Sequence, residues 1–436
     1  MNAIDSYFQQ VLSYGRNMKV ILEAPLHDKD CVLGNILAAH YLSSCDPSKV
    51  NLYVKSASSK LERSTPYEKA VFETVTYLIS EDKDDDLAFE MHIELLKRFP
   101  KDLVYLKRAQ VLSFQMAKPV PFLNLVQQVL PENQDESYIH GMLAFPLLEL
   151  GRMEEAAAAS RKGYGINKED ALAHHCVSCF KQVDISFSIL GFSFSCKDLT
   201  LCTHNWWHVA LCYLEGGSPM SKVKEIYDNH IWKELEKEDA IPPEVYLNAL
   251  GLFLRLDVRD VLDGFKDRLE LLAARLTDQV SHALLDILIV WALAKVGETS
   301  MAHELLEGLK FRLSKMNKTK QQVMQKAIQL GEAVYEYAKG NYKQALCLLG
   351  SDFNAIDYKI IAASDEQIDV FNEVWCQLLL KTGQSSTAKE VIRKRIKVRE
   401  GSPFTWRLQE KSYAMEGDAE ALNAGQRAKM LESSYF

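Results

Sequence analysis

The sequence has few of the residues that interrupt helices, with 12 prolines and 20 glycines among 436 residues. No Asn-Gly or Asp-Gly turn separates two runs of alternating apolar residues, which is the usual signal of a β-hairpin. The chain also lacks any stretch near the roughly 20 apolar residues that cross a bilayer, and it lacks the basic start and apolar run of a signal peptide. We therefore expect a helical, cytoplasmic protein without membrane insertion.

Basic residues are in the minority, because 51 Lys and Arg stand against 59 Asp and Glu, a formal net charge of −8. Nucleic acid is not an expected partner, since unspecific binding to it depends on a surplus of positive charge. The cysteines number nine. An odd number scattered among helical patterns indicates reduced thiols and not a disulfide framework.

Local enzyme motifs are missing as well. The chain contains no Gly-rich phosphate loop, no Gly-x-Ser-x-Gly elbow and no His-Glu-x-x-His pair. We therefore expect no cofactor and no catalytic residue, although a site assembled from distant residues remains an alternative.

Most segments of ten to twenty residues carry apolar side chains at helical spacing. Phe72, Val75 and Ile79 form one stripe, a polar break follows, and Ala88 and Leu95 begin a second stripe. These spacings are typical of a tetratricopeptide unit, in which small residues let two antiparallel helices approach each other.

A turn glycine followed five residues later by a small residue repeats along the chain. The copies are Gly151 with Ala156, Gly297 with Ala302, Gly340 with Ala345, and Gly383 with Ala388. Gly217 is a weaker copy, because Lys222 stands where the small residue is expected.

The pattern predicts an all-α fold, a tetratricopeptide-like α-solenoid of antiparallel helix pairs with irregular repeat lengths. We expect one elongated helical-repeat domain over residues 1–436. Its clearest units lie at about 72–105, 138–171, 204–237, 284–313, 327–352 and 370–400.

The segment THNWWHVALCYLEGGSPMSKVKEIYDNHI, from Thr203 to Ile231, resembles the signature region of the tetratricopeptide repeat protein 38 family. That region has an HN-aromatic-WH-x-AL helix and a second helix that ends in IYD-x-HI. Asp369 to Asn372 and Gly401 to Pro403 match further along the chain. The resemblance implies a helical-repeat protein of poorly defined function.

Two family elements are absent from this chain. The helix before the signature reads H-x-V-A-H-x-H-E-M in the family, and only its first histidine, His175, is present here. The family's Phe-Asn-Asp-x-His element is not evident between Leu284 and Ala294. Any chemistry that relatives perform with those polar groups is therefore not expected in this protein.

His204 and His208 stand four residues apart, so on a helix both rings project from one face. This spacing can chelate zinc, but the sequence places no third ligand, and we expect no metal. A polar pocket for a ligand or partner would use His175, His204, Asn205, Trp207 and His208. The alternative is that these histidines bond between helices while Trp206, Ala210 and Tyr213 pack in the core.

Two other clusters carry weaker hypotheses. Cys176, Cys179, Cys196 and Cys202 suggest a thiolate zinc site, but their spacing disfavours it. The basic run from Arg393 to Arg399 is typical of a solvated helix. Its alternative is a rim that clamps an acidic peptide.

The preferred function is a non-catalytic scaffold or adaptor that binds a protein or peptide in its concave groove. The alternative is an enzyme or small-molecule-binding protein with a His/Asn/Trp pocket around His175 and His204–His208. A third alternative is a purely architectural part of a larger assembly.

Overall fold

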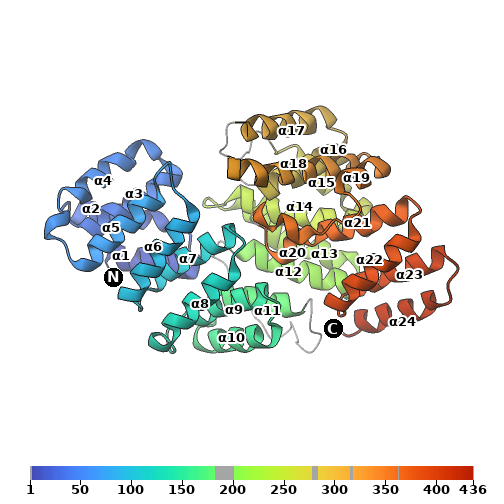
Figure 1. The fold of residues 1–436 in the computed structure, drawn as a ribbon, viewed down its shortest axis with the longest axis horizontal. Coiled ribbons are helices and arrows are strands. Elements are labelled where there is room, and N and C mark those ends of the chain that lie inside the picture. The colour runs from blue at the N-terminus through green and yellow to red at the C-terminus, as the bar shows by residue number, and fades with distance from the viewer. Residues whose placement is uncertain (1, 182–200, 277–282, 315–317, 362, 436) are drawn as a thin grey trace. The chain divides into compact units, whose positions relative to one another are not determined.

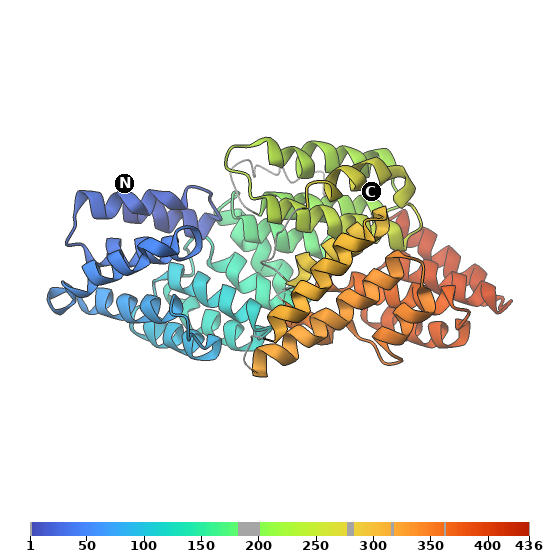
Figure 2. The same ribbon diagram turned by 90° about the horizontal axis from the view of Figure 1, so that it is seen from above.

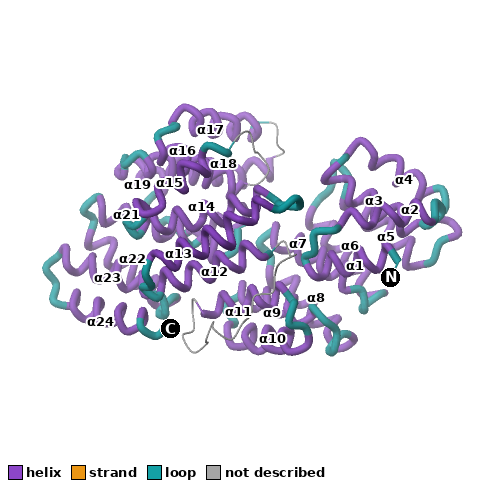
Figure 3. The backbone as a smooth tube through the Cα atoms, turned by 180° about the vertical axis from the view of Figure 1, so that it is seen from behind, coloured by secondary structure: helices purple, strands orange, loops and turns teal. Residues whose placement is uncertain are grey.

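The computed structural model describes residues 2–181, 201–276, 283–314, 318–361 and 363–435. Regular structure in these residues is helical, and no β-strand occurs among them (Figures 1 and 3). Many helices that follow one another along the chain pack against each other. The expected all-α, helical-repeat fold class is confirmed.

The chain divides into two compact units, one containing Met1–Val177 and the other containing Thr203–Phe436. The expectation of a single domain over residues 1–436 stays a prediction. None of the helices in the described part of the chain is both long and apolar enough to cross a membrane.

The helices of the first unit form successive pairs in contact along the chain. They are α1 (Ala3–Ser13), α2 (Ala24–His27), α3 (Val32–Cys45), α4 (Val50–Ser58), α5 (Pro66–Leu78), α6 (Asp85–Arg98), α7 (Leu103–Gln115), α8 (Pro119–Val129), α9 (Ile139–Glu149), α10 (Met153–Ile166) and α11 (Ala171–Lys181).

The predicted pair near residue 72 is α5 and α6. α5 begins at a capping box in which Thr65 and Glu68 bond each other's backbone N–H groups. Val71 and Val75 of α5 share one core cluster with Ala88 of α6, and all three are almost completely buried. Apolar spacing and the cap together determine where this pair starts and which face it buries.

The second unit contains α12 (Cys202–Glu215), α13 (Met220–Ile226), α14 (Pro242–Val258), α15 (Lys266–Ala273), α16 (Ala283–Val296), α17 (Thr299–Leu313), α18 (Lys318–Ala338), α19 (Tyr342–Leu349), α20 (Asp365–Ile368), α21 (Val370–Lys381), α22 (Ser385–Val398), α23 (Pro403–Met415) and α24 (Glu420–Glu432). α18 packs on α19, α21 on α22, and α23 on α24, as Figures 1 and 2 show for the orange and red helices.

α14 is the central helix of the second unit. It contacts both α16 and α21, although these helices lie progressively later in the sequence. Residues Asn248 to Val258 are all buried, so this helix has no solvent-facing side over that stretch. Every polar side chain on it must therefore find a partner inside the unit.

The turn glycines have the conformation that the sequence predicts. Gly151, Gly297, Gly340 and Gly383 have φ between 70° and 96°. The alanines that follow them by five residues are all 0 % exposed. In the weaker copy Gly217 has φ 61°, but Lys222 is exposed. Positive φ ends the first helix of a pair, and the alanine lets the second helix approach closely.

We expect Ala156→Leu to destabilise the protein by about 1–3 kcal/mol, because three extra carbons have to fit where the α9–α10 contact leaves no free surface. Urea unfolding measures the loss. The matched control is Lys222→Leu, at the equivalent exposed position after Gly217, which should change stability by less than about 0.5 kcal/mol. Equal effects of the two substitutions would contradict the role of the small residue.

Candidate functional site

Four of the five predicted site residues lie on α12 in the second unit: His204, Asn205, Trp207 and His208. Asn205, Trp207 and His208 are almost completely buried, and His204 is half-buried. The fifth, His175, lies on α11 in the first unit, where its ring is 5.9 Å from that of Phe145. It is 2 % exposed.

The rings of α12 stack on one another. His204 lies parallel to Trp207, with ring centroids 5.2 Å apart, and His208 meets both rings edge to face. In the alternative interpretation of the histidines, Trp206 packs in the core. The structure corrects this part of it, because Trp207 is 1 % exposed whereas Trp206 is half-buried and stacks on His230.

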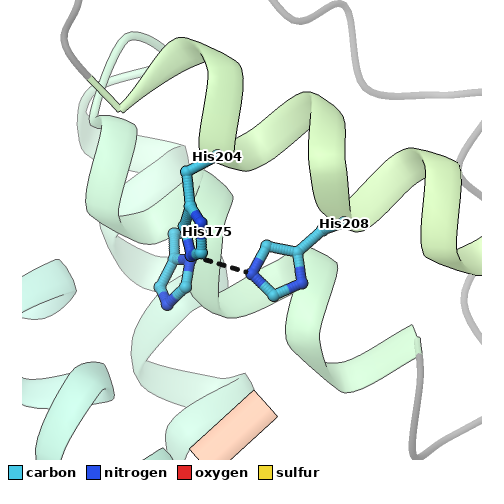
Figure 4. A group of neighbouring side chains, drawn as sticks. All are labelled: His175, His204 and His208. Atoms are coloured by element: carbon cyan, nitrogen blue, oxygen red, sulfur yellow. Dashed lines mark hydrogen bonds between the residues drawn. The ribbon is translucent and has the colours of Figure 1, made fainter. Parts of the chain in front are cut away.

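A hydrogen-bonded chain connects α12 to α14. Asn248 donates its amide hydrogens to Thr203 Oγ1 and the Glu244 carbonyl, both at 3.0 Å. Its oxygen is therefore left to accept, and His204 Nδ1 lies 2.9 Å from it. His204 Nε2 is 3.2 Å from His208 Nε2 (Figure 4).

These contacts determine the tautomers of both rings. His204 donates from Nδ1, so its Nε2 carries a lone pair and accepts from His208 Nε2–H. Burial lowers the pKa of His204 from 6.5 to about 4, and the bond to Asn248 opposes the shift in part. His204 is therefore neutral at pH 7, and its orientation is set by an amide 44 residues further along the chain.

Asn248, Thr203 and Glu244 are not among the site residues predicted from the sequence. No local motif identifies them, although Asn248 is a polar residue within the apolar stretch of α14 and could have been noticed as a core residue in need of a partner. Of the four cysteines considered for zinc, Cys176 and Cys202 are buried, whereas Cys196 and the side chain of Cys179 lie outside the described residues.

The basic run from Arg393 to Arg399 is solvated in part: Arg393, Lys394 and Lys397 are exposed, whereas Arg395 and Arg399 turn to a carboxylate. Arg395 donates to Asp369 Oδ1 at 2.6 Å, and Arg399 contacts the other oxygen of the same carboxylate. The side chains of Arg395 and Asp369 are each 10 % exposed. The two guanidinium groups hold the pKa of Asp369 far below its usual value, against the effect of burial. The sequence prediction of a solvated helix is wrong for these arginines.

A second buried ion cluster lies at the end of α14. Arg259 donates to Glu373 at 2.8 Å and also contacts Glu215, and its side chain is 8 % exposed. Its guanidinium lies 3.9 Å from the ring centre of Phe404. These contacts join α14 to α12, α21 and the start of α23.

No protein-family model matches this chain. Among solved structures, the chain is similar to the tetratricopeptide repeat domain of P58(IPK), at 13% sequence identity and with a TM-score of 0.23, over 84% of this chain and 98% of that chain. A score of this size does not decide the fold, which rests on the helix packing above. The resemblance to the tetratricopeptide repeat protein 38 family stays a prediction.

We expect acid to destabilise the protein partly through His204. The unfolded ring takes up a proton below about pH 6.5, but the folded ring does so only near pH 4, so stability is complete above pH 6.5 and is lost as the pH falls to 4. The loss is up to roughly 3 kcal/mol. His204→Gln should weaken this pH dependence in thermal melts. His27→Gln, at an exposed histidine, is the control, and a change of the same size there would refute the assignment.

We expect Asp369→Asn to cost about 3–5 kcal/mol in urea unfolding, because it leaves Arg395 and Arg399 without a carboxylate in a buried place. The control is Asp260→Asn, whose carboxylate is half exposed and pairs with Lys381 at 3.0 Å. Its loss should cost less than about 1 kcal/mol. A small effect of Asp369→Asn would mean that the two ion pairs of Asp369 contribute little to stability.

Proposed function

We propose that this protein is a non-catalytic helical-repeat scaffold that binds a segment of another protein on its surface. The observation that supports it best is an open hollow of about 480 Å³ among α19, α21 and α22. Stacked helix pairs leave such concave surfaces by construction. The volume lies in the range of about 300–1,000 Å³ that ligand sites occupy.

The lining of this hollow suits a peptide. Leu346 and Leu379 supply apolar surface, and Lys343, Gln384 and Thr387 supply exposed polar groups that can bond a peptide backbone or an acidic side chain. The hollow belongs wholly to the second unit, so it does not depend on the first.

We expect Thr387→Trp, which fills the hollow, to reduce retention of a bound partner at least about tenfold, a loss of about 1.4 kcal/mol or more. A quantitative pull-down from native extract with the purified full chain measures this. The control is Lys397→Trp, an exposed position on the same helix that does not line the hollow. Thermal melting verifies that both variants fold. Identical partner sets for the two variants would refute this surface.

The five predicted site residues remain a proposal of their own. His204→Ala with His208→Ala in one chain tests them in the same pull-down, after melting shows that the variant folds. Loss of a partner would support binding at α12. Full retention would remove α12 from the binding surface and leave the hollow as the proposed site.

The second candidate function is a small-molecule-binding protein or enzyme that uses the polar chain of α12. The fixed tautomers of His204 and His208 favour it, because an oriented imidazole can act as acid or base. Its test is mass spectrometry of small molecules released from the purified protein. A compound bound by the wild type and lost in His208→Phe would support this function, and its absence from both would count against it.

A further inference from the structure

Two buried N–H donors near α12 have no hydrogen-bond partner among the described residues. They are Trp207 Nε1 and Arg255 Nη1. Trp207 is 1 % exposed and Arg255 is 4 % exposed. A buried donor without an acceptor costs about 1–3 kcal/mol, and more when it carries charge, so two of them together need an explanation.

Both side chains line one small cavity of about 10 Å³, next to Asn248 and Gly251 of α14. A Cβ on Gly251 would lie 3.5 Å from Trp207 Nε1, so the indole N–H faces the part of α14 that lines the cavity. The cavity volume is close to the smallest that holds one water-sized particle, so an occupant somewhat larger than water requires the lining to shift slightly.

No carboxylate forms an ion pair with the guanidinium of Arg255 among the described residues. Its Nη2 contacts the backbone carbonyl of Glu366, which is not a carboxylate. Three nearby arginines, Arg259, Arg395 and Arg399, each have a carboxylate partner within ion-pair distance. Burial raises the pKa of Glu366 and so favours its neutral form. Burial lowers the pKa of Arg255 to about 10, and the carboxylates of Glu373 and Asp369 oppose this shift from beyond ion-pair distance. The charge of Arg255 therefore persists at neutral pH, and no carboxylate forms an ion pair with it in the part of the chain that the structure describes.

Most of the remaining wall is apolar. Leu247, Leu284, Leu288 and Val370 line it, and the partly exposed Gln367 adds one polar side chain. In such surroundings a positive charge attracts an anion more strongly than at a wet surface, because the local dielectric constant is low. A water molecule would accept from both donors but would leave the positive charge of Arg255 unpaired.

We propose that this cavity is an internal site for a small monovalent anion of the halide class, held by Trp207 Nε1–H and Arg255 Nη1–H. The guanidinium of Arg255 also lies 5.1 Å from the ring centre of Trp207, so both donors belong to one contacting pair. The site joins Trp207 of α12 to Arg255 of α14, in addition to the hydrogen bond between His204 and Asn248. A bound anion stabilises this contact between the two helices. It is independent of any protein partner.

The first test is thermal melting of the purified full chain in sodium chloride and in sodium gluconate at equal ionic strength. Gluconate is too large for the cavity. We expect chloride to raise Tm saturably, by about 2 °C or more. A rise that is equal in both salts is a general salt effect and would overturn the proposal.

The variants locate the effect. Trp207→Phe keeps the ring but removes the N–H, and Gly251→Ala keeps both donors but puts a methyl group beside the indole nitrogen. Each should abolish the chloride-specific rise. Trp291→Phe is the matched control, because its N–H lies 3.4 Å from an Asp257 oxygen and it does not line the cavity. It should retain the rise, and loss of the rise in this variant alone would refute the assignment.

The direct measurement is a crystal of the wild type grown in bromide. An anomalous peak within hydrogen-bond distance of Trp207 Nε1 and Arg255 Nη1 supports the site. Density there without an anomalous signal means that only water occupies the cavity, and it would overturn the proposal even if the melts depend on chloride.

Discussion

The polar side chains of α14 have to be satisfied inside the second unit, and much of the surrounding architecture meets this constraint. The helix is buried from Asn248 to Val258, so water does not serve its polar groups. Asn248 bonds to α12, Asp257 pairs with Lys295 of α16, and Gln377 of α21 donates to the carbonyl of Val258. Each bond joins α14 to a different neighbour, so the same contacts that satisfy its polar groups also set the order of helices around it.

The ion clusters extend this arrangement to α21 and to the region of α22. Arg259, at the C-cap of α14, contacts Glu215 of α12 and Glu373 of α21. The carboxylate of Asp369, directly before α21, pairs with Arg395 of α22 and with Arg399 just after it. Buried ion pairs add little net stability compared with apolar packing, but a partner left alone is costly, and this makes incorrect pairings of helices unfavourable. Arg255 differs from these arginines because its positive charge has no carboxylate partner beside it.

The candidate site on α12 depends on the same helix. The i, i+4 spacing of His204 and His208 places both rings on one face, which the sequence predicts without a structure. Which ring donates is decided by Asn248, whose amide is itself oriented by Thr203 and the Glu244 carbonyl. A spacing rule within one helix contains no information about a residue on another helix, so the neutral state of His204 and its tautomer could not be predicted.

The sequence by itself determined the helical class, the turn glycines and the small residues that follow them, because these are local properties: backbone sterics at positive φ and a side-chain period of 3.6 residues act within one pair of helices. It did not determine which indole of Trp206 and Trp207 is buried, nor that Arg395 and Arg399 face Asp369 and not solvent. Those outcomes depend on which helices pack on which faces. Only the tertiary structure decides this, because burial and charge pairing arise between residues far apart in the chain.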